Sequence, residues 1–222
     1  MELKNRNDIE SRFMAKMNKL SSKHRRELIN LMGNPPDIRN VPTDFWQRVE
    51  QEEREQLAAF LMIIMMGNAE AHGMGTDSAR MMADAHSVRR AAEIARDYAR
   101  NSYAKALMIQ RQNSDRLGGP ITLSPGGLRS ELEKVFGPTR DEALVATETT
   151  RASVEGAENA MRTAGMVSQD DEWETRPWMT QTGPCPICEP LDGLPRSVWG
   201  RVHPKGPPIH PRCACAIQYA RG

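Results

Sequence analysis

The chain has 222 residues, enough to bury a hydrophobic core and to form one or two domains. Its 30 Lys and Arg residues nearly balance its 29 Asp and Glu residues, so the net charge does not demand nucleic acid or a membrane as partner. The most apolar run, residues 57–66, is shorter than the roughly 20 residues that cross a bilayer. Residues 1–12 lack the apolar segment of a secretory signal. We therefore expect a protein made and used in the cytoplasm, or in a particle assembled there.

The first half of the chain has the apolar spacing of α-helices. A first helix is expected over Ile9–Leu31, where apolar residues recur every three or four positions, and Pro35 ends it. A second helix is expected over residues 43–66, with a break that starts at Gly67. A third, without Pro or Gly, is expected from about Asp77 to Gln112.

Changes in composition predict three regions. Residues 1–117 form a helical N-terminal region, and residues 118–127, which are rich in Gly and Pro, form a linker. Residues 128–222 form a C-terminal domain that contains a zinc-binding segment, residues 185–215.

The C-terminal domain is expected to start with two helices, residues 128–136 and 139–164. From Asp170 onward Pro, Gly, Trp and Cys dominate and the helical period is lost, so we expect short strands and turns there. The predicted fold class is therefore mainly α, with a helical N-terminal region followed by a small α+β, zinc-stabilised C-terminal domain.

All four cysteines lie in one short stretch, which reads Cys185-Pro-Ile-Cys188 and then, after a loop, His210-Pro-Arg-Cys213-Ala-Cys215. A C-x-x-C turn holds two thiolates on one side, and the second group can complete a tetrahedral zinc site. In a reducing compartment such a cluster indicates metal rather than disulfides. We expect a structural Zn²⁺ ion on Cys185, Cys188 and Cys213, with His210 and Cys215 competing for the fourth position.

Several alternatives for this stretch stay open. His203 is a further possible ligand, and a disulfide pair could replace the metal. A zinc-dependent hydrolase or nuclease would need Glu148 or Asp192 beside an open metal position. A zinc-ribbon DNA-binding module would need basic residues around the cysteines. The basic residues that keep this last option open are Arg196, Arg201, Lys205, Arg212 and Arg221.

The order of these features resembles a known signature. Residues Trp178 to Cys215 read W-M-T-Q-T-G-P-C-P-I-C-E-P-L-D-G and, later, P-P-I-H-P-R-C-A-C. This is similar to the C-terminal part of the phage head morphogenesis family, typified by Mu protein F. Upstream, Thr147, Glu148 and Arg151 resemble the family's helix with a Thr-Glu pair and a later Arg. The resemblance covers roughly residues 128–222.

Two departures from the family pattern do not touch a proposed ligand. Gln181-Thr182-Gly183 stands where an acidic residue is often found, and Ala214 stands where a basic residue is common. The resemblance implies a minor capsid protein of a tailed phage or prophage that associates with the portal and acts in head assembly or DNA delivery. It implies a structural protein and not an enzyme, located in the virion and, during assembly, in the host cytoplasm.

The first expected helix also carries a basic stripe beside its apolar stripe. The stripe predicts contact with packaged DNA or with an acidic face of another head protein, while a solvated helix edge is the simpler interpretation. No membrane partner is expected. The stripe consists of Arg12, Lys16, Lys19, Lys23 and Arg26.

Overall fold

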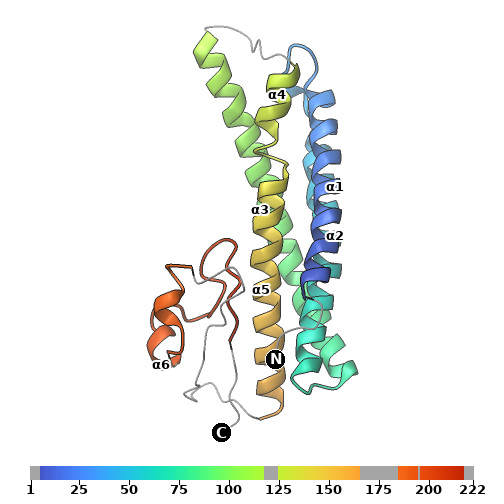
Figure 1. Ribbon diagram of the computed structural model, residues 1–222. Coiled ribbons are helices and arrows are strands. Elements are labelled where there is room, and N and C mark those ends of the chain that lie inside the picture. Colours follow the sequence, from blue (N-terminus) through green and yellow to red (C-terminus); the bar gives the residue numbers. More distant parts are fainter. Residues whose placement is uncertain (1–5, 118–124, 166–184, 195, 218–222) are drawn as a thin grey trace. The chain divides into compact units, whose positions relative to one another are not determined.

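The computed structural model describes residues 6–117, 125–165, 185–194 and 196–217, and these are mainly helical, as predicted (Figure 1). No β-strand occurs among them. No helix in these residues has the length and apolar content needed to span a membrane. The elements in chain order are α1 (Arg6–Met32), η1 (Ile38–Asn40), α2 (Thr43–Ala71), α3 (Thr76–Leu117), α4 (Pro125–Leu132), α5 (Pro138–Thr163), η2 (Glu189–Leu191) and α6 (Arg196–Trp199).

The expected break at Gly67 is wrong, because α2 continues through this residue. Asn68, one position later, is buried, and its side-chain amide donates to the backbone one turn earlier and to Ser153 Oγ. This packing outweighs the helix-propensity cost of a glycine, about 1 kcal/mol. The chain turns instead at Gly73, whose φ of +92° is readily adopted only by glycine.

The part of the expected linker that is described is helical, since α4 begins at Pro125. Residues 118–124 lie outside the described part of the chain. The strands expected from Asp170 onward do not occur in residues 185–194 or 196–217, which form turns and the short helices η2 and α6. Residues 166–184 of that prediction lie outside the described residues.

Two compact units divide the chain. Unit 1 comprises Met1–Glu10, Phe60–Ser87 and Ala143–Gly222, and unit 2 comprises Ser11–Ala59 and Val88–Glu142. Each unit therefore combines residues from both sides of the expected linker.

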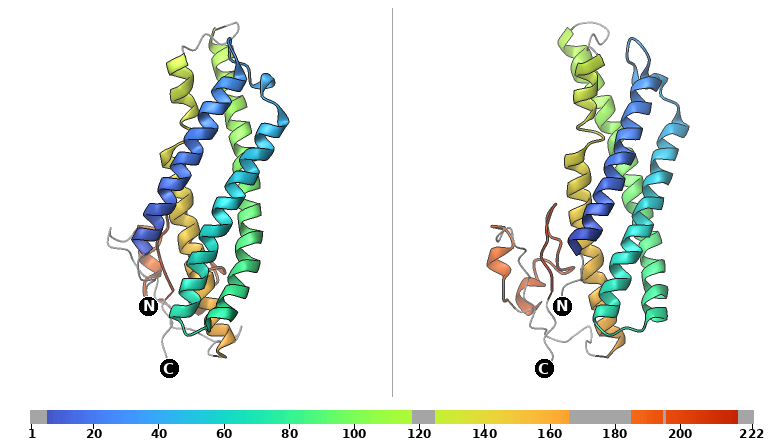
Figure 2. Two further views of the ribbon diagram at one scale, coloured as in Figure 1. Left: turned by 90° about the vertical axis from the view of Figure 1, so that its right-hand side faces the viewer. Right: turned by 45° about the vertical axis from the view of Figure 1, so that its right-hand side comes forward.

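Unit 2 packs segments of α1, α2 and α3 with α4 and the start of α5 (Figure 2). Phe136, which follows α4, is fully buried among aromatic rings. Its ring centroid lies 5.6 Å from that of His24 on α1, 6.5 Å from Trp46 on α2 and 6.0 Å from Tyr98 on α3. One aromatic side chain thus joins three helices of the unit, and such contacts add to the stabilisation from burial alone.

A polar network is also buried in unit 2. The Ser21 hydroxyl donates to Asp141 Oδ1 at 2.9 Å, the Tyr98 hydroxyl donates to the same oxygen at 3.4 Å, and the two hydroxyl oxygens are 3.0 Å apart. These residues come from α1, α3 and α5. Burial raises the pKa of Asp141, while the two hydroxyl donors favour its ionised form.

Glu53 is fully buried beside this network, and neither of its carboxylate oxygens has a hydrogen-bond partner among the described residues. His24 Nδ1 is 3.7 Å from Glu53 Oε1. Burial raises the pKa of Glu53 to about 8, with a further contribution from the Asp141 carboxylate. The side chain is therefore mostly protonated and neutral at pH 7.

Unit 1 contains the hairpin of α2 and α3, with α5 packed on it. Ala69, Ala79 and Ala160 form a buried cluster that methionine side chains surround. A Cβ atom at Gly156 of α5 would come within 2.5 Å of the Met65 carbonyl oxygen, so only glycine allows this close approach to α2. Small residues thus set the spacing of the helices in this unit.

The buried carboxyl group of Glu53 makes unit 2 less stable as the pH rises. The folded-state pKa of about 8 lies above the ordinary value of 4.5, so the folded protein binds this proton more tightly than the unfolded chain does. The stability that this bound proton contributes is complete below pH 4.5. It is lost between pH 4.5 and pH 8, by about 1.4 kcal/mol per pH unit. Glu53→Gln should remove this loss.

In urea titrations the unfolding free energy of the wild type should fall, relative to that of Glu53→Gln, by roughly 4 kcal/mol between pH 5 and pH 9. The matched control is Glu52→Gln at the neighbouring, half-buried position, where the carboxylate contacts Lys23 at 2.5 Å and His24 at 3.1 Å. The control should lose up to about 1 kcal/mol and keep the pH dependence of the wild type. A Glu53→Gln curve parallel to the wild-type curve would contradict the buried, neutral state of Glu53.

Candidate metal centre

Two tight turns of unit 1 carry the predicted metal ligands. In the first turn, the Cys188 N–H group donates to the Cys185 carbonyl at 2.9 Å, and the chain enters η2. The backbone N–H groups of Ile187 and Cys188 also donate to the Cys185 sulfur. In the second turn, the Cys213 N–H group donates to the His210 carbonyl at 3.1 Å. Each turn thus presents its ligand side chains from one short piece of backbone.

The structure brings these ligand atoms together in two groups that share Cys188. Cys185, Cys188 and His210 form one group, and Cys188, Cys213 and Cys215 form the other. Within each group the ligand atoms lie within 4.8 Å of one another. All four cysteines are free thiols, so the disulfide alternative is not what the structure contains. Either group could hold a metal ion, and all five predicted residues take part.

His210 is oriented for coordination. Its Nε2 lies 2.9 Å from Cys185 Sγ and 3.3 Å from Cys188 Sγ. Its other ring nitrogen, Nδ1, lies 2.8 Å from the Pro211 carbonyl oxygen, a distance at which the Nδ1–H group donates to that oxygen. Such a bond leaves a lone pair on Nε2 facing the thiols, which is the common arrangement of metal-binding histidines.

The environments of the thiols differ sharply. A hydrogen bond from the Cys215 thiol, together with backbone N–H donors from Cys215 and Ile209, lowers the pKa of Cys213 to about 5. The pKa of Cys215 is raised because its thiol donates a hydrogen bond to Cys213 and is buried. Burial raises the pKa of Cys188 to about 12. Without a cation the thiolate form is thus favoured at Cys213 over Cys188 and Cys215. A divalent metal ion would supply the positive charge that lets further thiols ionise.

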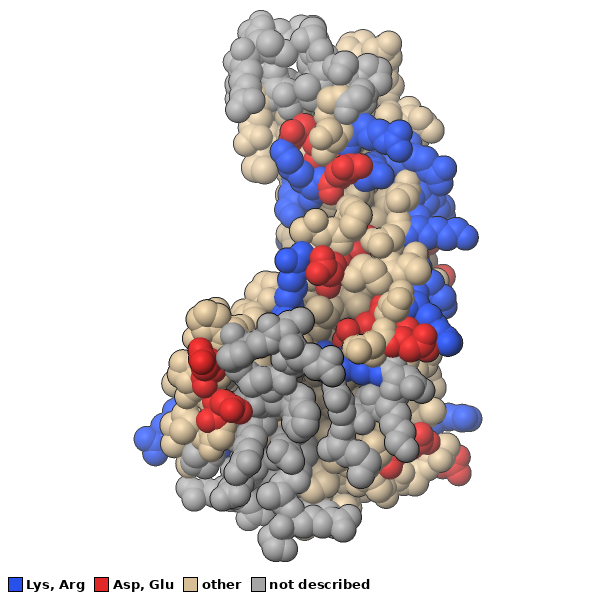
Figure 3. All heavy atoms as spheres, viewed as in Figure 1, with Lys and Arg blue, Asp and Glu red and all other residues tan. Residues whose placement is uncertain are grey.

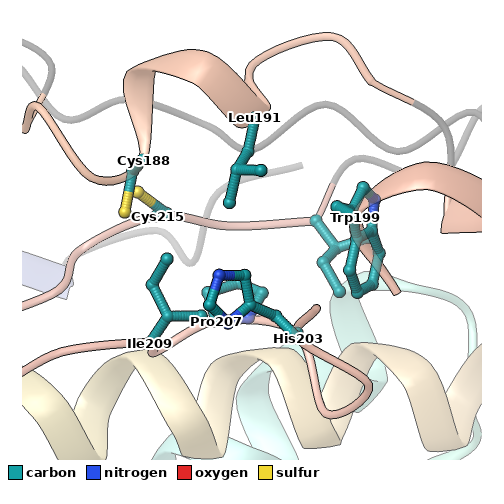
Figure 4. A pocket seen from close by; sticks show the side chains of 9 residues that line it. Cys188, Leu191, Trp199, His203, Pro207, Ile209 and Cys215 are labelled. Carbon is teal, nitrogen blue, oxygen red and sulfur yellow. The ribbon is translucent and has the colours of Figure 1, made fainter. Parts of the chain in front are cut away.

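An apolar pocket adjoins the centre. Its wall includes the sulfurs of Cys188 and Cys215, which lie next to each other (Figure 4). His203, the outside candidate for a ligand, lines this pocket and belongs to neither group of ligand atoms. The remaining lining residues are Leu191, Trp199, Gly206, Pro207, Ile209 and Ile217.

The ligand-bearing segment contacts α5 of the same unit. The Arg212 N–H group donates to Thr147 Oγ1 at 2.9 Å, and Arg196 Nη1 lies 3.5 Å from Glu158 Oε1. Arg212 lies between two predicted ligands and has a φ of +62°, a left-handed conformation that is uncommon for residues other than glycine. Thr147, which belongs to the helix that resembles the family's Thr-Glu helix, therefore makes a direct contact with this segment.

The two carboxylates of the hydrolase alternative lie elsewhere. Glu148 is buried on α5, with Oε2 3.5 Å from Arg151 Nε. Asp192 is exposed at the end of η2. Among the described residues, neither belongs to a group of possible metal ligands.

The basic residues near the centre have different surroundings. Arg196 lies near Glu158 and over the Trp199 ring, at 5.8 Å from the ring centroid. Arg201, Lys205 and Arg212 are exposed. Arg221 lies outside the described residues.

The basic stripe of α1 is exposed along its whole length. Figure 3 shows Lys and Arg side chains along the edge of the molecule where α1 lies. Lys23 is bound to Glu52 of α2 at 2.5 Å, and Arg26 Nε donates to the Ser22 carbonyl at 3.3 Å. Lys16 and Lys19 are exposed between these residues and Arg12.

The described residues thus define a mainly helical protein with a cluster of cysteine and histidine ligands that could hold a metal ion. Comparisons with protein-family models, with curated proteins and with solved structures yield no match to the chain.

The contact between Arg212 and Thr147 allows a sharp test of how the segment is held. Thr147→Val keeps the shape of the side chain and removes the acceptor, so the Arg212 amide should exchange its hydrogen about fivefold faster, corresponding to about 1 kcal/mol. Thr149→Val on the same helix is the control, because the buried Thr149 hydroxyl has no hydrogen-bond partner among the described residues. That variant should leave exchange at Arg212 unchanged. Equal exchange rates in both variants would show that Thr147 does not hold the segment.

Proposed function

We propose that the protein is a minor capsid protein of a tailed phage or prophage that associates with the portal and acts in head assembly or DNA delivery. The observation that carries this proposal is the gathering of the C-P-x-C and H-P-x-C-x-C residues of the family signature into one cluster. Thr147, from the second part of the resemblance, contacts this segment. Two sequence features that resemble the family are therefore parts of one structural unit.

The proposed role is structural and not enzymatic. A catalytic zinc site keeps one position open for water or substrate, whereas the two groups of possible ligands here share Cys188 and carry five sulfur and nitrogen donors between them. We place the protein in the virion, in the head interior or at the portal vertex, and in the host cytoplasm during assembly.

The metal in this proposal is a structural Zn²⁺ ion that stabilises a small C-terminal α+β domain. Thiolate and imidazole are the ligands that zinc prefers in proteins, and the donors here are soft sulfur atoms and one ring nitrogen. Few apolar side chains of the segment are buried, so metal binding would supply much of its folding energy. When bound, the ion neutralises the thiolates and joins the two turns.

Removal of zinc should unfold the C-terminal segment and spare the helices. We expect Cys185→Ser to reduce the zinc content from about one ion per chain to a small fraction, and to make residues 185–217 sensitive to protease. Far-ultraviolet circular dichroism should retain most of the helical signal. The control is Ile187→Ser in the same turn, where the side chain is exposed. Full zinc content and thermal stability in Cys185→Ser would refute the zinc site.

Packaged DNA is the second proposed partner, through the basic stripe of α1. All five side chains of the stripe are exposed, and their spacing places them on one face of the helix. Lysine and arginine side chains neutralise the phosphates of a nucleic acid backbone, and binding through them weakens as salt rises.

Purification of the tagged protein from phage-producing cells tests both partners. We expect portal protein to copurify with the wild type, with or without nuclease treatment. DNA should copurify at low salt, and the double variant Lys16→Glu, Lys19→Glu should lose the DNA and keep the portal. Recovery of the bare protein alone would contradict the role in head assembly. DNA binding that the double variant retains would contradict the role of the stripe.

A further inference from the structure

His24 of α1 lies between two acidic side chains of α2. Its Nε2 is 3.1 Å from Glu52 Oε2, and its Nδ1 is 3.7 Å from Glu53 Oε1. His24 and Glu53 are buried, whereas Glu52 is half-buried and reaches solvent. We propose that these three side chains form a proton-operated contact between α1 and α2. Loss of one proton from Glu53 moves the imidazole hydrogen of His24 from Nε2 to Nδ1, and the bond from His24 to Glu52 is broken.

The bond to Glu52 sets the tautomer of His24 while Glu53 is protonated. A carboxylate can only accept hydrogen bonds, so at 3.1 Å the Nε2 atom carries the hydrogen and donates it. Burial acts to raise the pKa of Glu52, but hydrogen bonds from Lys23 and His24 lower it, so Glu52 is ionised at neutral pH. Burial lowers the pKa of His24, so its ring is neutral. The lone pair of the ring therefore lies on Nδ1, on the side of Glu53.

The neutral carboxyl group of Glu53 complements this lone pair. A protonated carboxyl group has one O–H donor, and both Glu53 oxygens and His24 Nδ1 are buried without a hydrogen-bond partner among the described residues. Leaving such groups unpaired costs free energy. The separation of 3.7 Å is just beyond hydrogen-bond range, and rotation about the terminal torsion of glutamate, which has broad minima, closes it. One O–H···N bond then satisfies both side chains.

His24 is the proton acceptor that the surroundings of Glu53 favour. Among the described residues, no other basic side chain lies within 4.0 Å of the Glu53 carboxyl group. Asp141 is the rival acceptor, but its Oδ1 already accepts bonds from the Ser21 and Tyr98 hydroxyl groups. Burial raises the pKa of Tyr98, so its hydroxyl group stays protonated. The charged and titratable side chains that face the pair are Glu52 of α2, Lys23 and Glu27 of α1, Tyr98 of α3, and Arg140 and Asp141 of α5.

Loss of one proton exchanges one hydrogen bond of His24 for another. The O–H bond of Glu53 breaks as an N–H bond forms at Nδ1, and the hydrogen on Nε2 leaves through Glu52 Oε2 to water. Glu53 is then a carboxylate that accepts from Nδ1–H, while the Nε2 lone pair faces the Glu52 carboxylate. Two groups that only accept hydrogen bonds repel each other, so the link from His24 to Glu52 is lost. Burial raises the pKa of Glu53 to about 8, which places this change just above neutral pH.

Nuclear magnetic resonance of the full chain with isotope-labelled histidine tests this change, because the shifts of the two ring nitrogens report which one carries hydrogen. At about pH 7 the hydrogen of His24 should lie on Nε2 and at about pH 9 on Nδ1, and the ratio of the two forms should change about a hundredfold, as for the loss of one proton. Glu53→Gln should keep the hydrogen on Nε2 at both pH values, because the glutamine amide donates to Nδ1 and does not ionise. His24→Asn identifies the His24 signals.

His72, just after α2, is the internal control in the same spectra. Its Nδ1 lies 2.8 Å from the Asn68 carbonyl oxygen, so its hydrogen should stay on Nδ1 at both pH values. A wild-type His24 that keeps its hydrogen on Nε2 at about pH 9 would overturn the proposal, and this is the outcome expected if Glu53 donates to Asp141 instead. Hydrogen on Nδ1 of His24 already at about pH 7 would overturn it as well. The wild-type spectra decide the outcome even if a variant does not fold, and the readout depends on neither zinc nor the portal.

Discussion

The C-terminal segment depends on the convergence of sulfur atoms and one imidazole. Among its described residues the buried hydrophobic side chains are Trp199 and three cysteines, so its core consists largely of thiols. A core of this kind removes little apolar surface from water and offers little stabilisation by itself. The contacts that join the segment to α5 lie at Thr147 and Glu158, and one of them uses the backbone between His210 and Cys213. The geometry of the ligand cluster and the docking of the segment are therefore linked.

Unit 2 is held together by a conventional core that also buries several polar groups. Its core is apolar and aromatic, yet it contains hydrogen-bonded Ser21, Tyr98 and Asp141. It also contains the carboxyl group of Glu53, which has no hydrogen-bond partner in the described part of the chain. Buried polar groups that pair in only one alignment of the helices oppose a shift of one helix along another. The cost of this arrangement is concentrated at Glu53, where protonation avoids a buried charge.

The proposed role in the phage head makes different demands on the cysteine and histidine cluster and on the basic stripe of α1. Cysteine and histidine donors on two separate turns suit an ion that holds the two turns together. The exposed basic side chains of α1 are available to a polyanion. Binding through such a stripe requires no cavity, which fits the proposed role in head assembly.

The sequence by itself determined the helical character of the chain and which cysteine and histidine residues could hold a metal ion, because both depend on local spacing. Periodic apolar residues predict α1 to α3 and α5, and C-x-x-C followed by H-x-x-C-x-C predicts the residues that meet. Only the tertiary structure decided that α2 continues through Gly67, because the packing of Asn68 against α5 is not local. Glu53 lies four residues from Val49 and from Leu57, both buried, so the helical period places it on the apolar face of α2. That its carboxyl group is fully enclosed there is decided by the helices packed around it. The orientation of His210 and the apolar surroundings of Cys215 likewise come from contacts between turns that are distant in sequence.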